Sequence, residues 1–330
     1  MAGRRRHGRA LLDAAVKGTT IERYRLHVRK FAQWGLSVEE DPTDPVEMDE
    51  VLCDYIHYLH EYGQPKSHAS LAFCGLIYFM PKYRSHLHLS FRALRGWNKL
   101  RPPTVRPPAT RGVALGTAAE LWHRGHREAS VMVLLAFEGF MRNAEVVALR
   151  FNDIALPGDM RLGVAPEGTA GVRIRRAKTG GEQWATIQDP LVVEVLRHFM
   201  STSATGESRL FPSMTSDRFR TAFYRAQKWL GFANAIYTPH SLRHGHASEA
   251  FLAGVSLETI MARGRWASVN TARYYIQTGR ALLLTVSLPA EVQLRMRLYQ
   301  KWPRRCFRLP PATSWDADRL GGYVSVSRAC

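Results

Sequence analysis

Cysteine is scarce in this 330-residue sequence: only Cys53, Cys74, Cys306 and Cys330 occur, and no two of them form a CxxC pair. Such scattered cysteines exclude a zinc ribbon and a disulfide scaffold as the basis of the fold. They are typical of a protein from a reducing compartment, so we expect an intracellular location.

Long apolar runs are also missing. No stretch reaches the roughly 18 apolar residues that cross a bilayer, so the sequence predicts no membrane-spanning helix and no membrane partner. The opening MAGRRRHGRALLDAAVKG is basic and lacks the apolar segment of a secretory signal. We interpret residues 1–14 as a basic, flexible arm, with a nuclear address or a phosphate-binding arm as alternatives.

Acidic residues are too few to balance the basic ones. The chain has 28 Asp and Glu against 46 Lys and Arg, a formal charge of +18 and a pI near 10.2. A polyanion is the natural partner of such a chain, and nucleic acid is the commonest polyanion. Composition alone leaves two alternatives, a basic coat on an ordinary surface and an anionic membrane.

A proline- and arginine-rich connector divides the chain. Residues 101–112, RPPTVRPPATRG, contain four prolines that prevent a continuous helix and favour an extended segment. We expect a small all-helical domain at 15–100 and a larger domain at 113–286. A tail at 287–330 begins with a helix pattern that could contact a neighbouring subunit.

Helical spacing of apolar residues dominates both domains, for example Ile21, Tyr24, Val28 and Phe31. The pattern changes around Thr179, where short β-prone runs flank two glycines and predict a hairpin. The expected fold class is therefore mainly α, an all-helical domain followed by a mostly helical domain with a small antiparallel β-sheet. Basic residues placed to contact DNA phosphates are Arg23, Arg25, Arg29, Lys30, Arg101, Arg106, Arg111, Arg173, Arg175 and Arg176.

One segment near the C-terminus contains residue types suited to phosphodiester chemistry. His240 and Arg243 are three residues apart and share a helix face, Trp266 follows Arg243 by 23 residues, and Tyr275 follows Trp266 by 9. Cleavage without a metal needs fixed cationic donors, a nucleophile and a proton donor for the leaving oxygen. Two arginines, a lysine, a histidine and a tyrosine meet those needs.

Each residue also has an ordinary explanation. Arg142 could form a structural ion pair with Glu145, Lys178 could be a solvated hairpin lysine, and both Tyr274 and Tyr275 could be core aromatics. The histidines at 240, 244 and 246 could suggest zinc, but no HExxH motif and no nearby carboxylate or cysteine completes a site. The order and spacing of the whole set favour the catalytic interpretation.

Three stretches together resemble the tyrosine recombinases, the phage integrase family. HSLRHGHASEAFLAGVSLETI, RGRW and ARYYIQT resemble the family's C-terminal signature, and EGFMRNAEVVALRFNDI resembles the segment of its first catalytic arginine. RRAKTGG resembles the β-hairpin that carries its catalytic lysine. The resemblance covers residues 113 to about 285, and the helical domain before the connector more weakly resembles the family's SAM-like core-binding domain.

The resemblance implies a role for each matching residue. Tyr275 would be the nucleophile and form a 3′-phosphotyrosine, while Arg142 and Arg243 would clamp the phosphate oxygens. Lys178 would protonate the leaving 5′-oxygen and His240 would assist proton transfer. Trp266 would pack or hydrogen-bond beside the phosphate, with Glu145 and His244 as supporting residues, and no metal, ATP or other cofactor would be needed.

Two local features of the C-terminal signature concern the choice of tyrosine and the residue before Trp266. The spacing of 9 from Trp266 selects Tyr275 rather than Tyr274, because neighbouring helical residues point about 100° apart. The position before Trp266 is Arg265, where the family frequently has glycine, and Gly264 stands one residue earlier.

The implied function is site-specific recombination of double-stranded DNA with paired sites, as is typical of mobile elements. The chain would be a monomer when free and a homotetramer on DNA, acting through a Holliday junction in a nucleoid or nucleus. A type IB topoisomerase and a DNA-binding protein of this fold that has lost cleavage are the alternatives.

Overall fold

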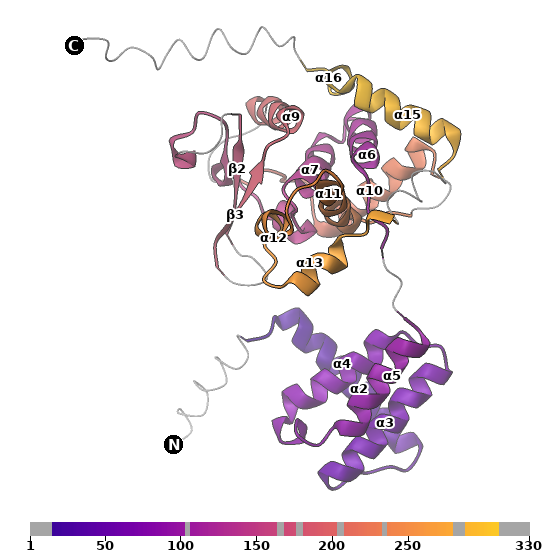
Figure 1. The fold of residues 1–330 in the computed structure, drawn as a ribbon. Helices are drawn as coiled ribbons and strands as arrows, with labels where there is room; N and C mark the ends of the chain where they lie inside the picture. Colours follow the sequence, from indigo (N-terminus) through magenta and orange to yellow (C-terminus); the bar gives the residue numbers. More distant parts are fainter. Residues whose placement is uncertain are drawn as a thin grey trace, which may run out of the picture. The chain divides into compact units, whose positions relative to one another are not determined.

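The computed structural model describes residues 15–102, 106–163, 168–175, 181–202, 208–232, 236–279 and 288–309 (Figure 1). The chain divides into two compact units, Met1–Val105 and Arg106–Cys330. Within the described ranges, no helix is long and apolar enough to cross a membrane.

The first unit is helical throughout its described part. It contains α2 (Gly18–Ser37), α3 (Pro45–Glu61), α4 (Lys66–Phe79), the 3₁₀ helix η1 (Pro81–Tyr83) and α5 (His88–Leu100). Helix α3 begins where the Asp44 carboxylate accepts hydrogen bonds from the N–H groups of Val46 and Glu47, with Pro45 in the first turn. The buried Asp49 carboxylate accepts hydrogen bonds from the N–H groups of Leu89 and Ser90, which joins α3 to the start of α5.

The second unit surrounds a large apolar core. Its helices are α6 (Arg111–His123), α7 (Arg127–Glu138), α8 (Asn143–Val147), α9 (Pro190–Ser201), α10 (Ser216–Leu230), α11 (Pro239–Leu252), α12 (Leu257–Gly264), α13 (Val269–Tyr275), α15 (Ala290–Lys301) and α16 (Pro303–Cys306), with 3₁₀ helices η2 (Phe151–Asp153) and η3 (Met160–Leu162). Helix α7 is buried along nearly its whole length, as expected for a helix at the centre of a core.

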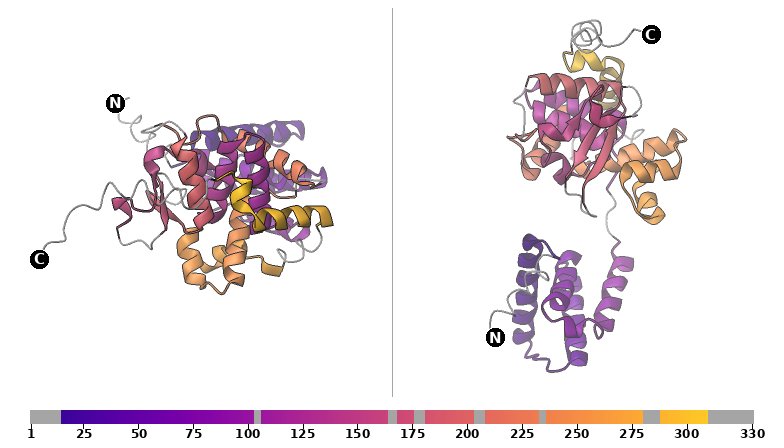
Figure 2. Two further views of the ribbon diagram at one scale, coloured as in Figure 1. Left: turned by 90° about the horizontal axis from the view of Figure 1, so that it is seen from above. Right: turned by 90° about the vertical axis from the view of Figure 1, so that its left-hand side faces the viewer.

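A three-stranded antiparallel sheet lies beside these helices (Figures 1 and 2). Its strands are β1 (Ile154–Ala155), β2 (Ala170–Ile174) and β3 (Gln183–Ile187), in that order. Val172 of β2 lies opposite Ile154 on one side and Ala185 on the other, and all three side chains are buried. The predicted fold class, mainly α with a small antiparallel sheet, is confirmed. The hairpin turn with Arg176 and Lys178 lies outside the described residues, as do residues 1–14.

The second half of the predicted connector at 101–112 packs on the second unit. Pro107, Pro108 and Ala109 are buried, and α6 already begins at Arg111. Ala109 donates its N–H to the Ser241 carbonyl of α11 at 2.9 Å. Gly245, one turn further along α11, has no side chain there; a Cβ at this position would lie 1.6 Å from the Ala109 carbonyl oxygen. The bare backbone of Gly245 is therefore what allows the chain entering the second unit to cross α11 in contact.

The helix that opens the predicted tail belongs to this unit as well. Val292 and Met296 of α15 lie in the core, and α15 runs along α6 (Figure 1). The Tyr299 hydroxyl donates to Glu120 of α6 at 2.7 Å. Gly112 of α6 leaves room for α15, since a Cβ there would lie 3.2 Å from the Gln300 side chain; a Cβ at Gly116 would instead meet Leu230 of α10 at 3.1 Å. The tail's role between subunits stays a prediction, and residues 310–330 lie outside the described part.

His246 joins α11 to α7 inside the core. Its ring stacks on Phe137 and Phe140, and Nδ1 lies 3.0 Å from the Phe137 carbonyl oxygen and 3.4 Å from a Glu138 oxygen. Burial, together with the charge of Arg263, lowers the pKa of His246 to about 3. The ring is therefore neutral at neutral pH and donates Nδ1–H to the carbonyl.

The Gly245→Ala substitution tests the crossing at Ala109. We expect it to lower the free energy of unfolding by at least roughly 3 kcal/mol, because the added methyl group meets a backbone atom that cannot rotate away. Thermal and urea denaturation measure the change. Gly96→Ala is the matched control, since nothing lies within 4 Å of a Cβ there; it should raise stability by about 0.5–1 kcal/mol. Equal stability of Gly245→Ala and wild type would contradict the crossing.

Acid should destabilise the second unit through His246. The unfolded histidine has a pKa of about 6.5, so between that pH and about 3 the unfolded chain binds a proton that the folded chain does not. Stability is therefore full above pH 6.5 and falls as pH drops through this window. His246→Gln keeps a donor but cannot titrate, and its denaturation midpoint should fall less steeply between pH 6.5 and 4.5. Identical slopes for the two proteins would exclude His246 as the cause.

Candidate active site

Three helices and one loop bring the predicted residues together. Helix α11 carries His240, Arg243 and His244, and its first turn is capped by Thr238. Trp266 follows α12, and Tyr275 ends α13. These elements share a small apolar cluster with Phe140, from the loop between α7 and α8.

Arg243 lies at the centre of this arrangement and is completely buried. Its Nη1 donates to the Phe140 carbonyl and its Nη2 to the Gly264 carbonyl, each at 2.5 Å. The guanidinium carbon lies 5.0 Å from the centre of the Trp266 ring and 5.3 Å from that of Tyr275. Burial, together with the charges of Arg142 and Arg265, lowers the pKa of Arg243 to about 10. The side chain still carries a full positive charge at neutral pH.

Tyr275 is held between two flat side chains. Its ring stacks on Trp266, with 4.6 Å between centroids, and on His244, with 4.5 Å between centroids. His240 approaches the same ring edge-on at 5.4 Å. The neighbouring Tyr274 is 55% exposed and makes only an edge contact with His244 and one with Tyr275. Of the two adjacent tyrosines, Tyr275 alone packs on Arg243 and Trp266 among the described contacts.

His240 is exposed, although the rings of His244 and Tyr275 pack against it. This partial desolvation lowers its pKa, and the nearby positive charges of Arg243, Arg142 and Arg106 lower it further. His240 is therefore neutral at neutral pH and able to accept a proton.

Arg142 enters the site through Glu145. It precedes α8, where its N–H donates to Glu145 Oε2 at 2.9 Å and its Nη1 donates to Oε1 at 2.6 Å. Arg265 Nη2 donates to the same carboxylate at 3.0 Å. Burial raises the pKa of Glu145, but the hydrogen bonds from Arg142 and the charges of both arginines outweigh that effect and leave the pKa below its ordinary value. Arg142 and Glu145 therefore form the structural ion pair that the sequence allowed, and this ion pair also orients the Arg142 side chain.

Two residues of the site have left-handed backbone conformations that glycine normally adopts. Phe140 has φ 48° and Arg265 has φ 55°, and each costs about 1–2 kcal/mol for a residue with a side chain. Gly264 is also required, because a Cβ there would lie 2.5 Å from the Trp266 ring. The Trp266 indole is buried, and Nε1 has no hydrogen-bond partner among the described residues. The conformation of the turn between α12 and α13 thus places the Trp266 ring against Arg243 and Tyr275.

Sequence reasoning missed Arg265 as a member of the site. Its side chain is only 6% exposed, and its donors reach the Gly139 and Phe140 carbonyls as well as Glu145. The sequence signal was present, since an arginine stood where glycine is frequent. Spacing alone could not show that its side chain turns inward.

The predicted DNA-contact residues fall into two groups. Arg23, Arg29, Lys30, Arg101 and Arg106 are exposed. The others that are described take part in ion pairs: Arg25 with Glu22, Arg111 with Asp189, and both Arg173 and Arg175 with Asp153. The buried Asp153 carboxylate ties β2 to η2 through these two arginines.

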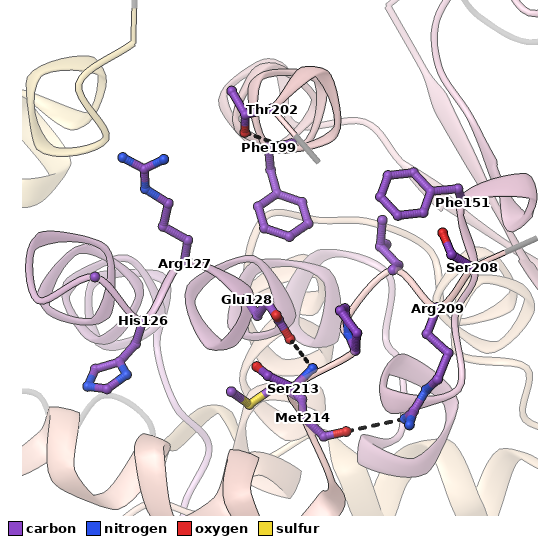
Figure 3. A pocket seen from close by; sticks show the side chains of 13 residues that line it. His126, Arg127, Glu128, Phe151, Phe199, Thr202, Ser208, Arg209, Ser213 and Met214 are labelled. Atoms are coloured by element: carbon purple, nitrogen blue, oxygen red, sulfur yellow. Dashed lines mark hydrogen bonds between the residues drawn. The ribbon is translucent and has the colours of Figure 1, made fainter. Parts of the chain in front are cut away.

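Two cavities of the second unit differ in their relation to the predicted site. A cavity of about 550 Å³ is lined by His126, Arg127, Phe199 and Arg209 among others (Figure 3), and none of the predicted catalytic residues lines it. A second, of about 420 Å³, touches the site through Glu145. Within the described ranges, no group of three His, Cys, Asp or Glu side chains is arranged to hold a metal ion. Lys178 lies outside those ranges, so its position relative to Tyr275 stays a prediction.

Comparison with solved structures shows the same fold. A lambda integrase dimer bound to a COC′ core site matches with a TM-score of 0.56 and 17% identity, over 83% of this chain and 76% of that one. The Tn1549 transposon integrase in complex with circular intermediate DNA matches with a TM-score of 0.52 and 13% identity, over 80% of this chain and 98% of that one. XerH site-specific recombinase bound to palindromic difH substrate, a post-cleavage complex, has a TM-score of 0.51 and 15% identity, over 76% and 72% of the two chains.

Comparison by sequence gives one match and one negative result. No curated protein matches the chain. The family model described as the phage integrase family matches residues 118–280, a range that contains Arg142, His240, Arg243, Trp266 and Tyr275. The chain therefore carries a domain of the phage integrase family, the tyrosine recombinases.

Proposed function

We propose that this protein is a site-specific DNA recombinase that cleaves and rejoins DNA through Tyr275. The observation that carries the proposal is the packing of the Tyr275 ring on the buried Arg243 guanidinium, with neutral His240 at its edge. A phenol beside a fixed cation and a proton acceptor is suited to attack on a phosphodiester.

The chemical step breaks one P–O bond and forms another. Tyr275 Oη attacks the phosphorus, its proton passes to His240, and the bond to the 5′-oxygen breaks. The leaving oxygen takes a proton from Lys178, and the phosphate remains on the tyrosine as a 3′-phosphotyrosine. Attack by a 5′-hydroxyl reverses the step, so the ester energy is retained and no ATP is consumed.

The arginines act on the phosphate rather than on the protons. Arg142 and Arg243 neutralise the non-bridging oxygens, whose charge rises in the five-coordinate state. The unpartnered Trp266 Nε1–H offers one further donor beside them. The Tyr275 ring lies over Arg243, so a phosphate that binds to Arg243 also lies beside the Tyr275 hydroxyl only if the ring shifts along the guanidinium.

The wider assembly follows from the same proposal. Strand exchange between two duplexes needs four cleavage sites, which we assign to a tetramer on paired DNA sites with a Holliday junction between two rounds of exchange. The +18 charge and the exposed basic residues of α2 support DNA as the partner. A type IB topoisomerase would relax supercoiled DNA without joining two duplexes, and a protein that has lost cleavage would form no covalent intermediate.

Tyr275→Phe should abolish covalent protein–DNA adducts and leave DNA binding unchanged. The substrate is a pool of duplexes with randomised flanks and one bridging phosphorothiolate, whose sulfur leaves without protonation and traps the adduct. Denaturing gels count the adducts, and gel shifts measure binding. The matched control is Tyr274→Phe, which removes the hydroxyl of an exposed neighbour and should cleave at the wild-type rate. Adducts from Tyr275→Phe but not from Tyr274→Phe would reverse the assignment.

Cleavage should continue at an unchanged rate in EDTA, because the proposed charge neutralisation comes from arginines. The same adduct assay, run in EDTA and in Mg²⁺, measures the two rates. A strict requirement for Mg²⁺ or Zn²⁺ would contradict the mechanism.

A further inference from the structure

Arg265 contacts the supports of both arginines that we assign to the phosphate. It donates to Glu145, the carboxylate that also binds Arg142, at 3.0 Å. It also donates to the Phe140 carbonyl at 3.0 Å, the same oxygen that accepts from Arg243. One guanidinium therefore reaches the support of Arg142 and the support of Arg243 at once.

The backbone of Arg265 connects these supports to the tyrosine. Arg265 occupies the turn between α12 and α13, next to Trp266, on which Tyr275 stacks. Its φ of 55° is a conformation that favours glycine, so arginine at this position is retained against local backbone preference. The Arg265 side chain is 6% exposed and its donors are bonded to the Gly139, Phe140 and Glu145 oxygens, so it holds these parts of the protein together.

We propose that Arg265 is a positioning residue for cleavage: it fixes Arg142, through Glu145, and Arg243, through the Phe140 carbonyl, relative to the turn that carries Trp266 and Tyr275. The inference rests on the proposed function, since it concerns the same phosphate site. The carbonyl of Phe140 points at both arginines because that residue is itself left-handed, with φ 48°. Loss of the Arg265 side chain leaves the Glu145 carboxylate bonded by Arg142 alone, so the pair of Arg142 and Glu145 loses its tie to the turn after α12.

Arg265→Gly is the sharpest test, because glycine suits the backbone conformation and removes only the side chain. The phosphorothiolate duplex pool gives the cleavage rate, and we expect a fall of roughly 100-fold, the usual effect of a displaced catalytic group, with DNA affinity unchanged. Arg265→Lys keeps one cationic donor and should recover part of the rate. It also serves as the test variant if the glycine variant does not fold.

A neutral substrate separates positioning from structural support. A methylphosphonate at the cleavage position lacks the charge that Arg142 and Arg243 neutralise, so it depends less on their placement. The ratio of phosphorothiolate to methylphosphonate cleavage should therefore fall at least about 10-fold in Arg265→Gly. Arg295→Gln is the matched control, since Arg295 also bonds a carbonyl and a carboxylate, on α15; its ratio should equal that of wild type.

The possible outcomes distinguish the positioning role of Arg265 from the proposed recombinase function. Wild-type cleavage by Arg265→Gly, or a reduced rate with an unchanged ratio, overturns the positioning role while the recombinase function stands. Absence of adducts from the wild-type protein on the whole duplex pool overturns the proposed function itself.

Discussion

The buried guanidinium of Arg243 is the interaction on which the candidate site depends. Removing a charge from water costs several kcal/mol unless hydrogen bonds replace the lost solvation. Here the replacement comes from the carbonyls of Phe140 and Gly264, which belong to different segments of the chain. The loop after α7 and the end of α12 must therefore both reach α11. The left-handed backbone of Phe140 and the missing side chain at Gly264 are the local costs of that requirement.

Positive charges outnumber negative charges around Arg243. Arg142, Arg243 and Arg265 converge, while Glu145 is the carboxylate that bonds two of them. A second buried carboxylate, Glu138, is bonded by Arg263, and its pKa is raised by burial despite that cation. The positive excess left near Tyr275 is balanced when an anion arrives. The charge around Tyr275 is thus suited to an anion such as the phosphate that we propose.

The sequence predicted the parts of the site that follow a regular spacing. His240 and Arg243 share one helix turn, and Trp266 and Tyr275 follow at distances that a helix, a turn and a second helix fix. The mainly helical fold with a small sheet was predictable for the same reason, because the spacing of apolar residues along the sequence indicates whether a segment is a helix or a strand. The choice of Tyr275 over Tyr274 also rested on spacing, and the packing agrees with it, although its chemical role stays a prediction.

What the sequence could not show depends on contacts between distant residues. Arg265 and Glu145 are 120 positions apart, and nothing local to either reveals their hydrogen bond. Arg111, Arg173 and Arg175 were expected at DNA, yet each is bound to a carboxylate that tertiary folding brings to it. The buried half of the connector was missed because four prolines predict extension, and extension is compatible with burial once Gly245 supplies a bare surface.

The crossing at Gly245 attaches the end of the connector to α11. Its last residues are hydrogen-bonded to α11 through Ser241, within one turn of both His240 and Arg243. Ala109 and Arg111 both donate their N–H groups to α11, to the Ser241 carbonyl and to the Glu249 carboxylate, so a shift of the entering chain acts directly on the helix that carries His240 and Arg243.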